Sequence, residues 1–500
     1  MEQKNKKKIS TQTIIKLLLA VVLLGLSAFL LKGDVWTFWT WWLLAGVMGF
    51  AAMPVTGRLF WRFEDKGWIF SKVLAIAATG FLTWFLTAIR LIPFNALTCA
   101  AVTILCAVIC FFLLRKESKE KTECFPVDRI SLIYWEELLF FLAFLMWTYL
   151  AGFRPAAYGT EKFMDYGFME AMMRSTTLPA RDLWYSEGHI NYYYGGQYFA
   201  VFLTKLSHTK VELTYNLMRT FVAGLAFAMP FSLVYQMMSD RMKGQQKSEK
   251  VIKRLPFAAG FTAGTAVSIA GNMHYVIYAQ IIPLIEKLTG KEVSSYWFPD
   301  ATRYIGYNPY REEDRTIHEF PCYSFVLGDL HAHVVNIMFV LLVIALLYVW
   351  LRGARKKIVP VETSMKDGKF WKEQLLMPHL LVVSVLLGMF QWTNFWDFVI
   401  YYVVTLGTVL FANIIRFQGK IKKIIVVTFA QMAEIYLLAY LVILPFTLQF
   451  DTMVDGIGIA KYHSYFYQLL VLWGLPAVLT ITFVISILWE KLRGMEHKSL

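Results

Sequence analysis

Apolar residues form long runs along this chain, and charged residues gather in the short stretches between them. Runs of about 20 apolar residues match the length at which an α-helix crosses the ~30 Å hydrocarbon core of a bilayer. The pattern predicts about twelve such spans, which we place at residues 12–31, 38–56, 68–89, 92–114, 132–151, 214–238, 255–283, 325–351, 376–396, 398–414, 424–446 and 465–490. We therefore expect an all-α integral membrane protein.

The composition excludes a soluble globular class. Hydrophobic residues make up 57% of the chain, charged residues only 17%, and the mean hydropathy is +0.50. Soluble domains carry more charge and less apolar surface than this. The net charge of +14 lies mostly in short connections that would face anionic lipid headgroups, so it gives no reason to expect a nucleic-acid partner.

The distribution of lysine and arginine predicts the orientation, because cytoplasmic loops retain these residues during insertion. If the basic N-terminus lies in the cytoplasm, most lysines and arginines fall on that side. We predict a multi-pass protein of the cytoplasmic membrane with both termini inside and its active face outside. The segment GGQYFAVFLTKL (195–206) is interpreted as a helix at the outer interface or partly re-entrant, which keeps a single crossing in this region.

The outer loop after the fifth span carries two acidic residues, Glu161 and Asp165. They are four positions apart in EKFMDYGFMEAMMR, so a helix there places both on one face. Two close carboxylates repel each other, which raises one pKa towards the range of a general base or favours a divalent cation. The alternative is a solvated helix N-terminus, where the helix dipole favours acids.

The same loop continues through Asp182 into NYYYGGQY, which contains Asn191, Tyr192, Tyr193 and Tyr194. Three tyrosines beside two glycines suggest a stacking and hydrogen-bonding surface for a sugar or lipid headgroup. The alternative is an interfacial aromatic belt, where tyrosine is enriched in any case.

A second outer loop ends in GDLHAHVV at the predicted eighth span. On a helix, Asp329 and His333 would share a face and His331 would point nearly opposite. Asp329 and His333 are therefore our candidate metal ligands, and Mg²⁺ or Mn²⁺ is the one cofactor that these loop carboxylates suggest. Ionisable groups beside a bilayer are costly unless they pair or face water, which favours function over structure here.

Asn394 and Asp397, at the end of the ninth predicted span, lie at the same predicted depth. Polar groups drawn from separate helices to one level are how a bundle builds a site. Arginine is the commoner cation of the outer loops, and arginine suits phosphate recognition; these residues are Arg154, Arg174, Arg181, Arg303, Arg311 and Arg315. Glu434, near the middle of the eleventh span, instead indicates an ion pathway or a buried polar contact.

The motifs TEKFMDYGFMEAMMRS, NYYYGGQYF, EFPCYSFVLGDLHAHV and TNFWDF, in this order, resemble the YYY-domain family of prokaryotic membrane proteins of unknown function. That family is thought to be similar to GT-C glycosyltransferases of the protein mannosyltransferase kind, which use polyprenyl-phosphate sugars outside the cytoplasm. The resemblance implies a GT-C-like bundle with a long outer loop and a juxtamembrane helix after the fifth span. It also implies a region 1–131 of four spans and a module 132–500 with outer loops 152–213 and 285–324.

In the GT-C enzymes an acidic motif, an amphipathic helix and a proline follow each other in the first outer loop of the module, and Glu161 matches the catalytic acid, with Asp165 its neighbour. Those enzymes usually show two adjacent acids, whereas Lys162 follows Glu161 here, so either Glu161 or Asp165 is the base. The implied reaction is an inverting sugar transfer from a polyprenyl-phosphate donor to a glycan, lipid or protein acceptor. The predicted substrate-binding residues are Arg174, Asp182, Asn191, Tyr192, Tyr193, Tyr194, His331, Asn394 and Asp397.

The competing hypothesis is a transporter or flippase of lipid-linked sugars or related anionic lipids. It draws on Glu434 and on the number of spans. A transporter would also show inverted repeats, and we detect none in the sequence. One-sided clustering of acids and histidines favours the transferase.

Overall fold

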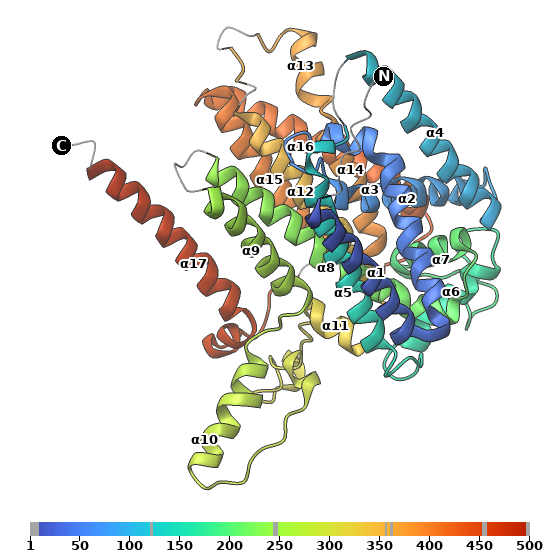
Figure 1. Ribbon diagram of the computed structural model, residues 1–500, viewed down its shortest axis with the longest axis vertical. Helices are drawn as coiled ribbons and strands as arrows, with labels where there is room; N and C mark the ends of the chain where they lie inside the picture. The colour runs from blue at the N-terminus through green and yellow to red at the C-terminus, as the bar shows by residue number, and fades with distance from the viewer. Residues whose placement is uncertain are drawn as a thin grey trace, which may run out of the picture. The chain divides into compact units, whose positions relative to one another are not determined.

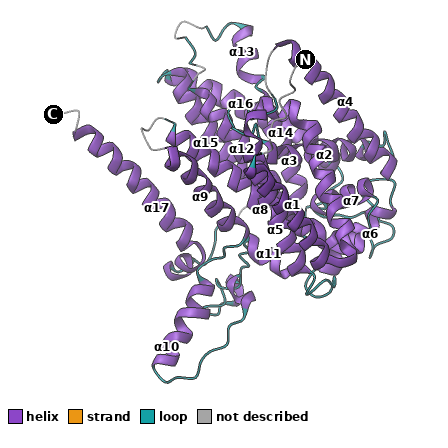
Figure 2. Ribbon diagram, viewed as in Figure 1, coloured by secondary structure: helices purple, strands orange, loops and turns teal. Residues whose placement is uncertain are grey.

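The computed structural model describes residues 10–120, 124–243, 249–355, 358–360, 364–452 and 458–496. Within these ranges every regular element is a helix, and Figure 2 shows helices joined by loops. The principal helices, labelled in Figure 1, are α1 (Thr11–Leu31), α2 (Val35–Leu59), α3 (Trp68–Ala88), α4 (Ala96–Glu120), α5 (Ile130–Ala151), α6 (Lys162–Arg174), α7 (Gly195–Ser207), α8 (Val211–Met242), α9 (Glu249–Ser268), α10 (Ile282–Leu288), α11 (Pro321–Leu327), α12 (Ala332–Ala354), α13 (Gly368–Leu375), α14 (Pro378–Thr393), α15 (Phe395–Phe417), α16 (Ile421–Thr447) and α17 (Phe466–Glu496). The predicted all-helical class is confirmed.

The chain divides into two compact units. Unit 1 comprises Met1–Ser268 and Phe325–Asp451, and unit 2 comprises Ile269–Ser324 and Thr452–Leu500. The first four helices belong to unit 1 together with later ones, since Tyr134 on α5 donates to the carbonyl of Lys16 on α1 at 2.8 Å. The two units do not divide at residue 131, and the division into a region 1–131 and a GT-C-like module 132–500 stays a prediction.

By length and composition, the described residues contain nine helical segments able to cross a membrane, or ten if one bent pair counts as a span. The predicted number of twelve is not confirmed. The first two predicted spans belong to one helical run, Thr11–Leu59. The ninth predicted span corresponds to the helix pair α13 and α14, which is bent by 53°. Within that first run the chain reverses at Lys32, and Trp39 Nε1 donates to Ser27 Oγ across the hairpin at 3.0 Å.

The seventh predicted span, 255–283, is wrong as one helix. Helix α9 ends at Ser268, and the chain then enters unit 2. The backbone N–H of Met273 donates to the carbonyl of Val471 at 2.9 Å, and the Asn272 side chain donates to the carbonyl of Ala301 at 2.6 Å. Tertiary hydrogen bonds thus replace helical ones here, although the apolar composition continues.

Helix α8 forms the core of unit 1, and most of its length is enclosed by neighbours. It packs closely on α5 because Gly224 has no side chain: an added Cβ would lie 2.9 Å from Cβ of Phe144. Small residues allow such backbone approach in membrane bundles. In Figure 1, α8 and α12 run through the middle of unit 1, and α12 contacts α8 directly.

The two predicted helices of the long loop are present as α6 and α7. Helix α7 has 13 residues and is buried from Gly195 to Lys205. At 1.5 Å per residue it spans about 20 Å, which is too short to cross a bilayer. Of our two interpretations, the enclosed position favours a re-entrant segment over a helix lying on the interface.

Candidate functional site

Glu161 and Asp165 lie one turn apart at the start of α6, as their spacing predicts. Glu161 is the N-cap residue, and its carbonyl accepts the backbone N–H of Asp165 at 3.2 Å. The Glu161 side chain is 60% exposed, whereas the Asp165 side chain is fully buried. One turn of helix therefore presents one carboxylate to the exterior and the other to the protein interior.

Helix α12 begins only at Ala332, and residues 328–331 directly before it are not helical. Gly328 has φ +93°, and a Cβ there would lie 2.5 Å from the Arg219 guanidinium. The prediction that Asp329 and His333 share a helix face is wrong, since Asp329 precedes the helix. Its buried carboxylate accepts the hydroxyl of Thr160 at 2.7 Å instead.

His331 meets both carboxylates of α6. Its Nε2 lies 2.7 Å from Glu161 Oε2, and its Nδ1 lies 4.0 Å from Asp165 Oδ2. The imidazole stands between them as the N-cap residue of α12. We call Glu161, Asp165, His331 and Gln197 the His331 cluster.

Gln197, on α7, holds Asp165 in place. Its Nε2 donates to Asp165 Oδ1 at 2.7 Å and to the carbonyl of Leu330 at 3.1 Å, and all of these groups are buried. The approach needs Gly196, because a Cβ there would lie 2.4 Å from Cα of Ala332. Sequence reasoning missed Gln197; its signal was a single amide directly after two glycines and before an apolar run.

Burial raises the pKa of Asp165 to about 6, against an ordinary value of 3.8. The positive character of His331 and the hydrogen bond from Gln197 oppose this rise, while the charges of Asp329 and Glu161 add to it. A carboxyl group that exchanges its proton near neutral pH suits proton transfer. Burial, followed by the charges of Glu161 and Asp165, raises the pKa of the Tyr192 hydroxyl.

Asn336, Thr393 and Asp397 form a second polar group, which we call the Asp397 cluster. Asn336 Nδ2 donates to Asp397 Oδ2 at 2.7 Å, and the Thr393 hydroxyl donates to Asn336 Oδ1 at 2.9 Å. The Asn394 side chain and the charge of His333 also act on the Asp397 carboxylate. The His331 and His333 rings stack with centroids 5.4 Å apart. These two histidines at the start of α12 therefore lie between the His331 cluster and the Asp397 cluster.

Two cations lie behind this site. Lys162 is 8% exposed and Arg219 is 2% exposed, and the Arg219 guanidinium donates to the carbonyl of Phe325 and to Asn216 Oδ1, both at 2.9 Å. Both cations adjoin Gly328. Burial lowers the pKa of Lys162, partly offset by Asp329. Among the described residues neither forms an ion pair within 4.0 Å, while the charge of the buried Asp329 carboxylate acts on both.

Three of the predicted substrate-binding residues make structural contacts away from the His331 cluster. Arg174 forms an exposed ion pair with Glu170 at 3.4 Å. Asp182 accepts the backbone N–H groups of Trp184 and Tyr185 within its own loop. Asn191 exchanges two hydrogen bonds with the backbone of Asp451, at 2.9 and 3.0 Å.

The three consecutive tyrosines diverge. Tyr193 packs against Phe450, with ring centroids 5.0 Å apart. The buried Tyr194 hydroxyl accepts Trp84 Nε1 at 3.0 Å, and its ring packs on Trp392. The Tyr192 ring packs against Phe168 of α6, with ring centroids 5.7 Å apart.

The predicted metal ligands separate as well. Asp329 bonds Thr160, whereas His333 faces Asp397. Within the part of the chain that the structure describes, no three His, Cys, Asp or Glu side chains gather to hold a metal ion. Metal binding by Asp329 and His333 stays a prediction, and the geometry adds nothing in its favour.

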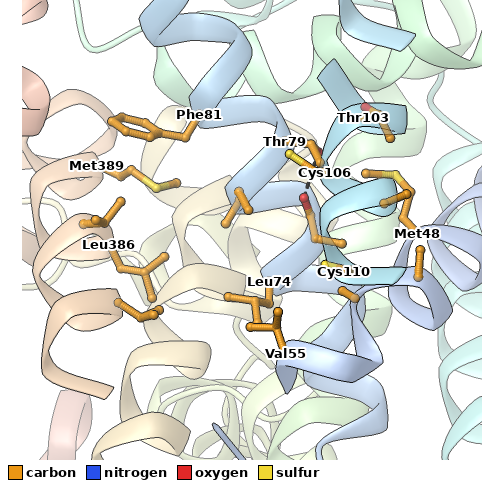
Figure 3. Close-up of a pocket in the computed structure, with 18 of the residues that line it drawn as sticks. Met48, Val55, Leu74, Thr79, Phe81, Thr103, Cys106, Cys110, Leu386 and Met389 are labelled. Carbon is orange, nitrogen blue, oxygen red and sulfur yellow. Dashed lines mark hydrogen bonds between the residues drawn. The ribbon is translucent and has the colours of Figure 1, made fainter. Parts of the chain in front are cut away.

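An apolar cleft of about 370 Å³ lies between α2, α3, α4 and α14 (Figure 3). Alanines supply much of its wall, no charged residue lines it, and its larger side chains include Leu74, Phe81, Leu386 and Met389. Phe81, in the cleft wall, packs on Trp84, and Trp84 Nε1 donates to the Tyr194 hydroxyl of the NYYYGG segment.

Residues 78–499 match the model of a family described as uncharacterized membrane protein (DUF2298). No curated protein and no solved structure matches the chain.

Proposed function

The chain belongs to the uncharacterized membrane protein family DUF2298 and is a multi-span integral membrane protein, and from its His331 cluster we propose that it is a GT-C-like glycosyltransferase. It would transfer a sugar from a polyprenyl-phosphate donor to an acceptor hydroxyl at the outer face of the cytoplasmic membrane. The observation that carries the proposal is the meeting of Glu161, Asp165 and His331 from separate segments.

Glu161 is the better candidate for the base, because its carboxylate is exposed and held by His331 at 2.7 Å. It takes the proton of the acceptor hydroxyl, whose oxygen then bonds the anomeric carbon. The bond from that carbon to the phosphate oxygen breaks, and its electron pair stays on the phosphate. Attack opposite to the leaving group inverts the anomeric configuration.

Asp165 acts behind His331 as a positioning residue. Its carboxylate, fixed by Gln197, lies 4.0 Å from His331 Nδ1 and favours a positively polarised imidazole. An imidazole so held fixes the Glu161 carboxylate. Protonation of Asp165 below about pH 6 would weaken this arrangement.

Lys162 and Arg219 are suited to hold the donor phosphate, since they are two buried cations that form no ion pair within 4.0 Å among the described residues. Cations at a developing phosphate charge lower the barrier to departure. The apolar cleft of Figure 3 suits a hydrocarbon chain of the donor. The sequence did not predict phosphate binding by Lys162 or Arg219.

The test uses cells that lack the gene and carry single variants. Glu161→Gln should stop transfer and make lipid-linked sugar accumulate, whereas Asp165→Asn should reduce transfer and change its pH dependence. Glu170→Gln, on the same helix but paired with Arg174, is the matched control and should behave as wild type. Normal surface glycans in the Glu161→Gln strain would end the assignment of the base.

Transport of a lipid-linked sugar is the alternative, and Glu434 is its one supporting residue. Glu434 lies on α16, and its Oε2 is buried and accepts no hydrogen bond from any residue that the structure describes. Transport coupled through this carboxylate predicts that Glu434→Gln abolishes function and that Glu161→Gln does not. The transferase predicts the reverse.

A further inference from the structure

A second group of buried acids lies at the other end of α5 from the His331 cluster. Asp65, in the α2–α3 connection, is 2% exposed, and Glu136, on α5, is fully buried. Glu136 is 15 residues before the end of α5, or about 22 Å along the helix. This group is therefore separate from the proposed transferase site.

The neighbouring acids all have partners. Glu137 Oε1 lies 2.6 Å from the buried Lys72 ammonium. Glu64 accepts the Ser239 hydroxyl at 2.6 Å and pairs with Lys243 at 3.2 Å. Each of these carboxylates thus has a cation or a hydrogen-bond donor that stabilises its negative charge.

Among the described residues, no lysine or arginine forms an ion pair with Glu136. Its nearest polar neighbours are the Asp65 carboxylate and the Ser232 hydroxyl, and neither Glu136 oxygen receives a well-formed hydrogen bond within the described residues. The Asp65 Oδ2 atom accepts the backbone N–H of Trp68 at 2.7 Å, which fixes the Asp65 carboxylate within the connection. Two carboxylates in contact away from water cannot both be ionised at an acceptable energy.

We propose that Asp65 and Glu136 bind one proton between them and that this proton holds the α2–α3 connection against α5. Its loss leaves two buried negative charges in contact and separates the connection from the helix. Burial raises the pKa of Asp65 to about 6, which agrees with a pair that titrates as one unit.

The groups around the pair do not supply a competing positive charge at Glu136. Lys72 is already paired with Glu137. Polar and ionisable residues of this region come from the connection and from α3, α5, α8 and α12. They are Arg62, Glu64, Lys72, Arg129, Glu137, Ser232, Tyr235, Gln236, Asp240, Lys243, Tyr348 and Arg352. The Asp240 carboxylate forms an ion pair with Arg352 at 3.4 Å. The proton is thus the cation that the pair lacks.

The adjacent glutamates Glu136 and Glu137 give a matched test in the full-length protein, purified in lipid nanodiscs. Glu136→Gln replaces a protonated carboxyl group by a neutral isostere, so its unfolding temperature at pH 7.5 should equal or exceed that of wild type. Glu137→Gln leaves Lys72 buried and unpaired, so it should lose several degrees. Equal losses in both variants would overturn the proposal.

Infrared spectroscopy gives a second readout that does not depend on the stability of Glu137→Gln. The difference spectrum of wild type minus Glu136→Gln at pH 7.5 should contain the C=O absorption of a protonated carboxyl group. A difference spectrum that shows only carboxylate bands means that Glu136 is ionised, and the proposal fails. Neither outcome depends on sugar transfer, so the two proposals are tested separately.

Discussion

Replacing Asp165 by asparagine should stabilise the protein at neutral pH. The pKa of this buried carboxyl is about 6 in the folded chain, against an ordinary 3.8. Because the folded state binds the proton more tightly, wild-type stability falls as pH rises from about 4 to about 6 and then stays constant. A rise of about two pKa units corresponds to about 3 kcal/mol, which asparagine avoids because it does not ionise while still accepting the hydrogen bond from Gln197.

The assay is the unfolding free energy of wild type and variant in matched detergent between pH 4 and pH 8. The difference should be small near pH 4 and grow to a plateau of about 3 kcal/mol in favour of Asp165→Asn above pH 7. Titrations common to both proteins cancel in this difference. Glu161→Gln is the control, since its 60% exposed carboxylate should change stability by less than about 1 kcal/mol. An Asp165→Asn protein no more stable than wild type at pH 7.5 would refute the electrostatics described here.

Three further outcomes follow from the geometry. Gly196→Ala should lower stability by about 1–3 kcal/mol, because its Cβ would lie 2.4 Å from the α12 backbone. Gly407→Ala is the control and should not lower stability, since a Cβ there has no atom within 4 Å. Thermal unfolding of both variants tests this prediction. Lys162→Met should weaken polyprenyl-phosphate binding about tenfold or more, measured by ligand titration, and unchanged affinity would exclude it from the phosphate site. In single-cysteine variants, polyprenyl phosphate should protect Cys106, in the apolar cleft, from an apolar maleimide but leave Cys322 in unit 2 unprotected; equal labelling would remove the cleft from the donor site.

Local patterns predicted the helix that carries Glu161 and Asp165. The spacing of Glu161 and Asp165 and the apolar positions between them predicted α6, and α6 is present. In the structure Glu161 also meets His331, whose Nε2 lies 2.7 Å from its carboxylate. Short-range periodicity carries this kind of information directly.

The start of α12 was less predictable. Apolar periodicity extended the helix back to residue 325, but Gly328 at φ +93° interrupts it. A glycine's conformation depends on what packs against it, here the Arg219 guanidinium, and a single sequence does not reveal that neighbour. The same holds for Gln197, whose role depends on a contact with Asp165, 32 residues away.

The predicted number of twelve spans was not confirmed, for a related reason. Residues 255–283 are apolar enough for one span, and only the tertiary hydrogen bonds of Asn272 and Met273 show that the helix ends at Ser268. Composition reports whether a segment tolerates lipid, whereas helix continuity depends on long-range partners.

Sugar transfer by the purified protein tests the central claim most directly. The chain would be reconstituted in nanodiscs with polyprenyl-phosphate sugars extracted from its own membranes, and released polyprenyl phosphate would be measured by mass spectrometry. Wild type should release it in the presence of acceptor, and Glu161→Gln should not. Equal release by both proteins, or none by wild type with the complete extract, would contradict a transferase that depends on Glu161.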